Sequence, residues 1–285
     1  MMFYNPGYTG IKANLNFVGD LRYYGENDYI SHFLADGRLG RFDSIRQLNP
    51  STGIHYRNDV IGPIIQQYYG IRLANSFKLK KGHKLSAGLL YDYVKTDIQK
   101  SQFRTPDGLV GSNIQDPTIV ATKESSHSHV LGLGVYFESK RKKLNGGISL
   151  DYKGVFNSDK DPGKDFGRKS DLLHTNASVG ATIKAGSYIR IIPLVFARTN
   201  YSTTTVRISA KIFFKDWVYI GSAWAFQEHY SLMAGARFGW KKIGKFELGF
   251  ASHYPKSISF FEYAHYAYIN YFFRSKNNFE SVNYN

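Results

Sequence analysis

The sequence predicts an all-β fold: an up-and-down antiparallel β-barrel of about 14 strands. Three observations support this prediction. Residues 203–250 alternate apolar and polar side chains in segments joined by very short polar turns, which is typical of a strand meander. Aromatic residues make up 16% of the chain, far more than a disordered chain would carry. Short and long connections also alternate along the sequence, as in barrels with turns at one end and loops at the other.

The two faces of the 203–250 meander differ in kind. One face carries large residues such as Ile208 and Trp224, and the other carries mostly glycine, serine, threonine, arginine and lysine. Large residues point inward in a soluble barrel and outward into lipid in an outer-membrane barrel. A soluble core would leave the face of Gly235 and Gly239 toward solvent, and aromatic residues cluster at strand ends, where membrane interfaces place them. We therefore predict a transmembrane β-barrel of the outer membrane, with a soluble barrel or sandwich as the alternative.

The expected strands follow from alternation bounded by turn residues. Asp36 and Gly37 form a two-residue hairpin signal, because such a turn needs positive φ. Residues 49–59, 98–126, 157–170 and 252–260 are expected to be loops. Outside the meander, strands are expected over 11–23, 29–35, 38–48, 61–79, 85–97, 129–139, 147–156, 172–185, 188–199 and 262–273.

The chain shows no composition shift that would mark a second domain. We expect an opening periplasmic segment at residues 1–10, a single transmembrane barrel at 11–273 and a C-terminal tail at 274–285. An even strand number places both termini on the periplasmic side. No secretory signal is visible at the start, so the sequence is expected to be trimmed there or to have a misassigned first residue.

The formal net charge is +15, but its distribution does not favour nucleic acid as a partner. Much of the positive charge sits in short turns at one end of the meander, where it would face anionic headgroups or an acidic partner. We predict a basic periplasmic rim made of Lys80, Lys81, Arg141, Lys142, Lys241 and Lys242. Cysteine is absent, which removes disulfides, thiolate metal sites and cysteine nucleophiles.

Motifs of catalysis and metal binding are weak in this sequence. Residues 239–245 match most of a phosphate-binding loop, but Phe246 replaces the final Ser/Thr and the segment lies in a β-hairpin. The aspartates of the 157–170 loop lack the glycine and glutamate spacing of a calcium loop. His127 and His129 share a strand face without further ligands. We therefore predict a non-enzymatic protein with no cofactor and no metal site; a lipid hydrolase with scattered Ser and His residues is a third option.

Charged residues on the polar face are the remaining candidates. Arg207, Lys211 and Arg237 lie on the polar faces of neighbouring strands, and Glu247 faces the strand of Arg237 across the 241–245 turn. They can pair across the lumen and hold the barrel's shape. They can also line an anion-selective pore. We favour the structural interpretation, and the register of the strands has to decide between the two.

Three segments carry a resemblance to a known family. Asn5-Pro6-Gly7-Tyr8-Thr9-Gly10 resembles the Asn-Pro-Ala-Tyr-Ala-Gly signature of the PorP/SprF family, with small residues at both alanines. Pro193 followed by the Asp216–Gly221 segment is similar to that family's proline-bearing strand and Trp/Gly strand. The 264–273 strand is similar to its closing aromatic strand, although Tyr266 stands where the family has Glu after His265.

The resemblance implies a non-enzymatic outer-membrane component of the type IX secretion system of Bacteroidetes, a Gram-negative group. Its implied role is export and surface attachment of a large secreted adhesin with a type B C-terminal domain, including gliding adhesins. Implied partners are outer-membrane lipid, the secreted protein or its C-terminal secretion domain, and periplasmic components of the secretion or gliding machinery. The alternative function is a passive porin or hydrophobic-solute transporter.

Overall fold

The computed structural model describes residues 5–11, 15–24, 28–39, 48–79, 82–99, 125–139, 143–154, 173–226, 229–240, 244–255 and 264–273. These residues form one short 3₁₀ turn and fifteen β-segments. No helix among them is long and apolar enough to span a membrane. The elements in chain order are η1 (Pro6–Tyr8), β1 (Leu15–Tyr23), β2 (Tyr29–Arg38), β3 (Leu48–Ile61), β4 (Ile64–Lys78), β5 (Lys84–Ile98), β6 (Ser125–Glu138), β7 (Leu144–Gly154), β8 (Leu173–Ala181), β9 (Ile183–Ala185), β10 (Ile189–Thr199), β11 (Thr204–Phe214), β12 (Val218–Ala225), β13 (His229–Trp240), β14 (Gly244–Pro255) and β15 (Ala264–Phe273).

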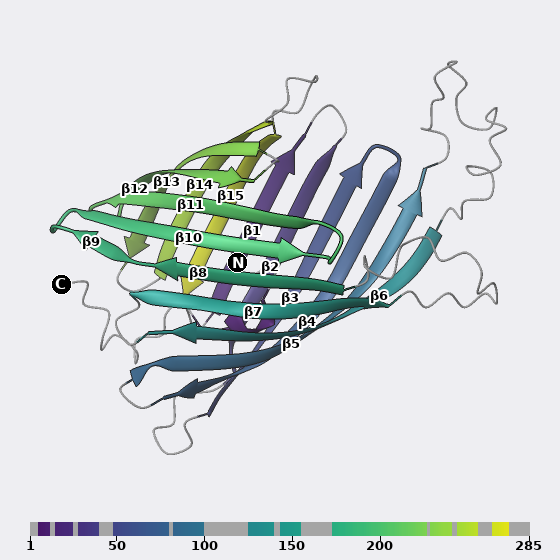
Figure 1. Ribbon diagram of the computed structural model, residues 1–285, viewed down its shortest axis with the longest axis horizontal. Helices are drawn as coiled ribbons and strands as arrows, with labels where there is room; N and C mark the ends of the chain where they lie inside the picture. The colour runs from purple at the N-terminus through teal and green to yellow at the C-terminus, as the bar shows by residue number, and fades with distance from the viewer. Residues whose placement is uncertain are drawn as a thin grey trace.

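The strands form one closed antiparallel ring (Figure 1). Each strand pairs with its neighbours in sequence, and the last pairs with the first, with Gly19 of β1 opposite Ile269 of β15. β8 and β9 both pair with β10 and are separated only by Thr182, so they occupy one position in the ring, which has fourteen. The predicted up-and-down barrel of about 14 strands is confirmed. Among the described residues, closure gives each of the fourteen positions a strand neighbour on both sides, as a barrel in lipid requires.

The side-chain distribution is that of a barrel immersed in lipid. Large apolar residues stand exposed on the outer face; Leu131 and Leu232 are each 59% exposed. Polar and charged residues are buried on the inner face, where Asn16 is 1% and Arg72 is 2% exposed. Such an arrangement would be unstable in water, because apolar side chains would be solvated and charged ones desolvated. The outward direction predicted for the large residues of the 203–250 meander is confirmed, as the exposed Ile208 illustrates.

Aromatic side chains form a row on the outer face of β3–β6. Ring centroids of Tyr56 and Tyr69 lie 5.2 Å apart, those of Tyr69 and Tyr93 6.4 Å, and those of Tyr93 and His127 5.5 Å. His127 and His129 are hydrogen-bonded to Tyr93 and Tyr91, with Nδ1 to hydroxyl distances of 2.6 and 2.7 Å. Such rings, apolar in body and polar at the tip, belong at a membrane–water boundary.

The structure corrects the expected order of elements near the N-terminus. Asp36 and Gly37 do not form a turn, because β2 runs through them and Asp36 pairs with Gly53 of β3. Residues 49–59, predicted as a loop, lie within β3. The reason is that this strand places polar residues on its inner face, which obscures the apolar alternation. β3 takes the place of the strand expected at 38–48, so the strand number is unaffected.

Two other boundaries differ. The turn between β3 and β4 lies at Gly62, whose φ of 53° is the left-handed conformation, and Pro63. This short connection is at the end of the barrel where long loops were expected, so the alternation of short and long connections is not strict. β14 extends to Pro255, into a segment expected to be a loop.

Candidate functional site

Residues 5–11 lie inside the barrel. Tyr8, Thr9 and Ile11 are only 4%, 2% and 3% exposed, and η1 contacts the inner wall formed by β4–β7. The segment Asn5–Ile11, called the plug below, crosses the inner wall from β7 back to β2, at the end of the barrel where β4 turns into β5. The sequence separates residues 1–10 as a distinct segment but contains no sign that it enters the lumen.

Asn5 anchors one end of the plug. Its Oδ1 accepts a hydrogen bond from the Gly7 amide at 2.8 Å, which caps η1, and Pro6 occupies the first helical position, where a missing N–H costs nothing. Its Nδ2 donates to the carbonyls of Val135 on β6 and Ile148 on β7, at 3.0 and 3.3 Å. One side chain therefore shapes the turn and attaches it to two strands.

Glycines on the barrel wall make room for the plug. Gly88 of β5 and Gly134 of β6 face each other in register on the inner face. A Cβ on Gly88 would lie 2.5 Å from the Pro6 carbonyl carbon and 2.7 Å from the Gly7 nitrogen. A Cβ on Gly134 would lie 2.8 Å from Pro6 Cδ. Neither position accepts a side chain while the plug is in place, so these glycines form its floor.

The other end of the plug is held through its backbone. Gly10, at φ 67°, donates its amide to Asp36 at 2.7 Å. Arg38 donates from Nε to the Gly10 carbonyl and from Nη2 to the Ile11 carbonyl, at 2.8 and 2.9 Å. Ser51 donates to the Thr9 carbonyl at 2.9 Å. Asp36, interpreted from the sequence as a turn residue, is therefore a buried acceptor for the plug.

Tyr8 occupies the centre of the plug. Its ring meets Tyr136 of β6 edge-on, with centroids 4.7 Å apart. Burial, followed by the carboxylates of Glu138, Asp36 and Glu247, raises the pKa of the Tyr8 phenol well above its usual value, so Tyr8 is neutral. These carboxylates come from β6, β2 and β14, on different sides of the ring. Tyr8 therefore reaches into the lumen that all of them face.

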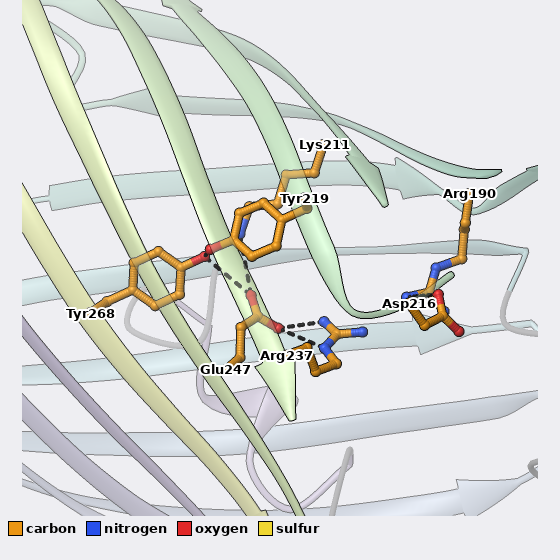
Figure 2. A network of polar contacts seen from close by, with 7 residues as sticks. All are labelled: Arg190, Lys211, Asp216, Tyr219, Arg237, Glu247 and Tyr268. Carbon is orange, nitrogen blue, oxygen red and sulfur yellow. Dashed lines mark hydrogen bonds and ion pairs between the residues drawn. The ribbon is translucent and has the colours of Figure 1, made fainter. Parts of the chain in front are cut away.

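A second polar cluster lies on the inner face of β11–β15 and is centred on Glu247 (Figure 2). Arg237, its register partner on β13, donates to Glu247 Oε2 from Nε at 3.1 Å and also from Nη2. Lys211 Nζ lies 3.5 Å from Oε1, and the Tyr268 hydroxyl donates to Oε1 at 3.1 Å. Glu247 is 5% exposed, so this buried carboxylate is matched by two cations and a phenol.

Two tyrosines complete this cluster, which we call the charge belt. Tyr219, Gly235, Gly249 and Tyr268 lie side by side in register on β12, β13, β14 and β15. Since the two central residues lack side chains, the tyrosines lean across them and their hydroxyls meet. The Lys211 ammonium lies over both rings, 4.6 and 4.9 Å from their centroids.

The predicted lumen charges thus fall into two groups. The structure brings Lys211, Arg237 and Glu247 together in the belt. Arg207 lies on the same inner face four residues along β11, opposite Ala225 of β12. An ion pair between Arg190 and Asp216, at 2.7 Å, lies to one side in Figure 2 and has no counterpart in the sequence prediction. The six residues of the proposed basic rim (Lys80, Lys81, Arg141, Lys142, Lys241 and Lys242) lie outside the described residues.

A family match places this barrel among known proteins. Residues 1–266 match the family model described as type IX secretion system membrane protein PorP/SprF. The chain belongs to the PorP/SprF family. It is therefore an outer-membrane β-barrel of the type IX secretion system. No curated protein sequence matches it.

Solved structures resemble this PorP/SprF protein in fold. The Ralstonia pickettii toluene transporter TbuX aligns over 96% of this chain and 92% of its own, with a TM-score of 0.58 and 9% identity. The Pseudomonas putida toluene transporter TodX aligns over 95% and 91%, with a TM-score of 0.51 and 6% identity. At such low identity the likeness extends to the barrel fold alone.

The first of the three segments that resemble the PorP/SprF family, Asn5–Gly10, lies within the plug. Asn5 caps η1 and bonds to two strands, and Pro6 starts the turn. Tyr8 is buried against the inner wall, and Gly10 adopts a backbone conformation that side chains disfavour. Thr9 contributes its carbonyl to Ser51. The motif's residue types are therefore those needed to fold a short turn against the inside of the barrel.

A third polar region, which we call the cup, lies on the inner face toward the other end of the barrel and was missed by sequence reasoning. It is a cavity of about 160 Å³ lined by Arg22, Ile30, His32, His55, Arg57, Tyr68, Leu90, Asp92, Val130, Asp151, Lys153, His174 and Arg198. These side chains come from strands as distant in the ring as β1 and β10. Alternation alone marks them as inward but cannot show that they share one cavity. In the part of the chain that the structure describes, no group of three or more His, Cys, Asp or Glu side chains is arranged to hold a metal ion.

Proposed function

We propose that this PorP/SprF barrel is a non-enzymatic scaffold that retains or presents a large secreted surface protein through that protein's type B C-terminal domain. Gliding adhesins are one class of such partners. In this proposal the loops at the cup end face the exterior and dock the secreted domain. The opposite end, with both termini and the basic rim, faces periplasmic secretion or gliding components.

The observation that carries the proposal is the burial of the chain's own residues 5–11 inside the barrel. A passive porin needs a continuous water-filled path. Here the plug is buried against the inner wall of β4–β7, and Tyr219, Tyr268 and Lys211 project inward from the opposite wall. A barrel whose interior is taken up in this way is suited to be a rigid support, with its function on its loops.

The second candidate is a porin or hydrophobic-solute transporter, because TbuX and TodX are described as toluene transporters. The lining of the cup argues against an aromatic hydrocarbon, since charged and histidine side chains dominate it. Planar-bilayer recording separates the two candidates. A steady conductance that loses anion preference in Arg207→Ala or Arg237→Ala would support the pore, whereas a silent barrel supports the scaffold.

The direct test of the scaffold removes the proposed docking loops. Residues 104–122 and 158–169 lie outside the described residues and within segments that the sequence assigns to loops. Deleting either one should abolish surface retention of a reporter fused to a type B C-terminal domain. Retention is measured by labelling intact cells that carry the full-length barrel or a deletion variant.

The control is a deletion in a short connection at the same end, residues 200–203 between β10 and β11. All variants must first show the mobility shift of a folded barrel on heating. If both long deletions leave reporter retention at the wild-type level, the docking proposal is wrong.

A further inference from the structure

The cup contains both signs of charge, and most of its charged groups already have partners. His55 Nε2 lies 3.3 Å from Asp92 Oδ1. The two residues flank Gly70 in register on β3, β4 and β5, and the missing side chain of Gly70 lets them meet. On the other side, Asn176 donates to Asp151 at 2.9 Å. Asp151 is therefore hydrogen-bonded through one oxygen, and Asp92 lies within ion-pair distance of a histidine.

Two of the arginines that line the cup have carboxylate partners. Arg57 donates from Nε to Asp59 at 2.7 Å and lies over the Tyr68 ring. Arg22 lies 3.6 Å from Asp20. These pairs fix the guanidinium groups in place, so that a ligand would meet a preorganised wall.

Lys153 is different. It projects from β7 into the cup and is partly buried. Among the residues that the structure describes, no carboxylate pairs with its ammonium group and no side chain or carbonyl accepts a hydrogen bond from it. A partly desolvated ammonium without a counter-charge is unfavourable, and an anion entering the cup would relieve that cost.

We propose that the cup is a binding site for a single carboxylate group, with Lys153 as its counter-charge and Arg198 facing the same space. The cavity of about 160 Å³ has room for a ligand of roughly benzene size, such as one amino-acid residue or a small organic acid. A singly charged carboxylate suits the site better than phosphate, because Asp92 and Asp151 would repel a dianion. The carboxylate can belong to a free small acid or to the C-terminus of a peptide. The site is independent of the proposed scaffold role.

The test uses the full-length barrel in detergent micelles and two probes that differ in charge alone, N-acetylglycine and N-acetylglycinamide. The acid should raise the melting temperature in a concentration-dependent way, and the amide should not. Lys153→Met should weaken binding of N-acetylglycine about tenfold or more, as expected for loss of a charged hydrogen bond. Inorganic phosphate should bind more weakly than the acid.

Lys95→Met is the matched control, because Lys95 lies on the outer face at the same end and pairs with Asp97 outside the cup. It should bind the acid as the wild type does. A decapeptide with a free C-terminus that binds more tightly than N-acetylglycine would identify a chain end as the source, and weaker binding would identify a small acid. Equal binding of acid and amide, or unchanged binding in Lys153→Met, would overturn the proposal.

Discussion

The two sides of the lumen use inward glycines for opposite purposes. On β5 and β6, Gly88 and Gly134 leave a hollow that is occupied by the backbone of the plug. The plug lies far from these strands in the sequence, because it precedes β1. On β13 and β14, Gly235 and Gly249 leave a hollow that is filled by the rings of their own register neighbours, Tyr219 and Tyr268. In both cases the missing side chain of glycine creates space. Backbone of the plug takes that space on one side, and tyrosine rings take it on the other.

The two sides should therefore differ in the kind of amino-acid substitution that they tolerate. The plug is held mainly through main-chain groups, such as the Gly10 amide and the carbonyls of Thr9 and Ile11, so its binding depends on shape. The charge belt is held by the Glu247 carboxylate, so its stability depends on charge. Steric changes should therefore disrupt the first side, and charge changes the second.

The largest change in access to the lumen is expected from adding one methyl group to the floor of the plug. In Gly88→Ala the new Cβ would overlap the Pro6 carbonyl, and overpacking of this kind costs about 1–3 kcal/mol. The plug should leave the wall, which would open the lumen. Because the chain has no native cysteine, Thr9→Cys provides a single reporter thiol, and its maleimide labelling should become much faster in the Gly88→Ala background.

The matched control is Gly239→Ala, also on the inner face. Its Cβ would lie 3.6 Å from the nearest atom, Lys245 Cγ, so it adds the same methyl group without a clash. Labelling of Thr9→Cys and bilayer conductance should match the parent protein. Slow labelling in Gly88→Ala would contradict the assignment of Gly88 as the floor of the plug.

The next effect concerns charge on the opposite wall. Glu247→Gln keeps the side-chain shape but leaves Arg237 and Lys211 facing each other without a counter-charge. Breaking a buried ion pair from one side costs about 3 kcal/mol, so the barrel's free energy of unfolding should fall by that order. The measurement is equilibrium unfolding in urea, followed by tryptophan fluorescence.

A double variant sharpens this prediction. Removing one cation as well, in Glu247→Gln with Arg237→Met, should recover part of the loss, because only Lys211 is then left without its carboxylate. Labelling of Thr9→Cys should stay slow throughout if the two sides act independently. Fast labelling in Glu247→Gln alone would show that the belt helps to hold the plug.

The smallest effect is expected at the anchor of the plug. Asn5→Ala removes the cap of η1 and the bonds to Val135 and Ile148, whereas the glycine floor remains. Loss of a capping residue typically costs about 1 kcal/mol. Labelling of Thr9→Cys should therefore rise by roughly fivefold, well below the effect of Gly88→Ala. A larger effect for Asn5→Ala than for Gly88→Ala would mean that the anchor, and not the floor, determines binding of the plug.

Sequence reasoning predicted the barrel, its strand number and the outward face of the 203–250 meander, because alternation is a local property of each strand. It also placed Arg237 and Glu247 on facing strands of one hairpin, where the connection is short enough to suggest the register. It was wrong at Asp36 and at 49–59, because a hairpin signal and a polar inner face both resemble a loop when the neighbouring strands are unknown. The cup was missed for a related reason, since its lining residues are contributed by strands far apart in sequence.

Local patterns in the sequence are enough to predict a barrel with apolar residues outside, since every strand carries its own two-residue period and lipid selects the apolar face. The residues that lie in the interior, in contrast, are known only from the folded barrel. Asn5 bonds to Ile148, 143 residues away, and Tyr219 meets Tyr268 across two glycines. Contacts of this kind depend on the register and curvature of the whole ring, and no local pattern encodes them.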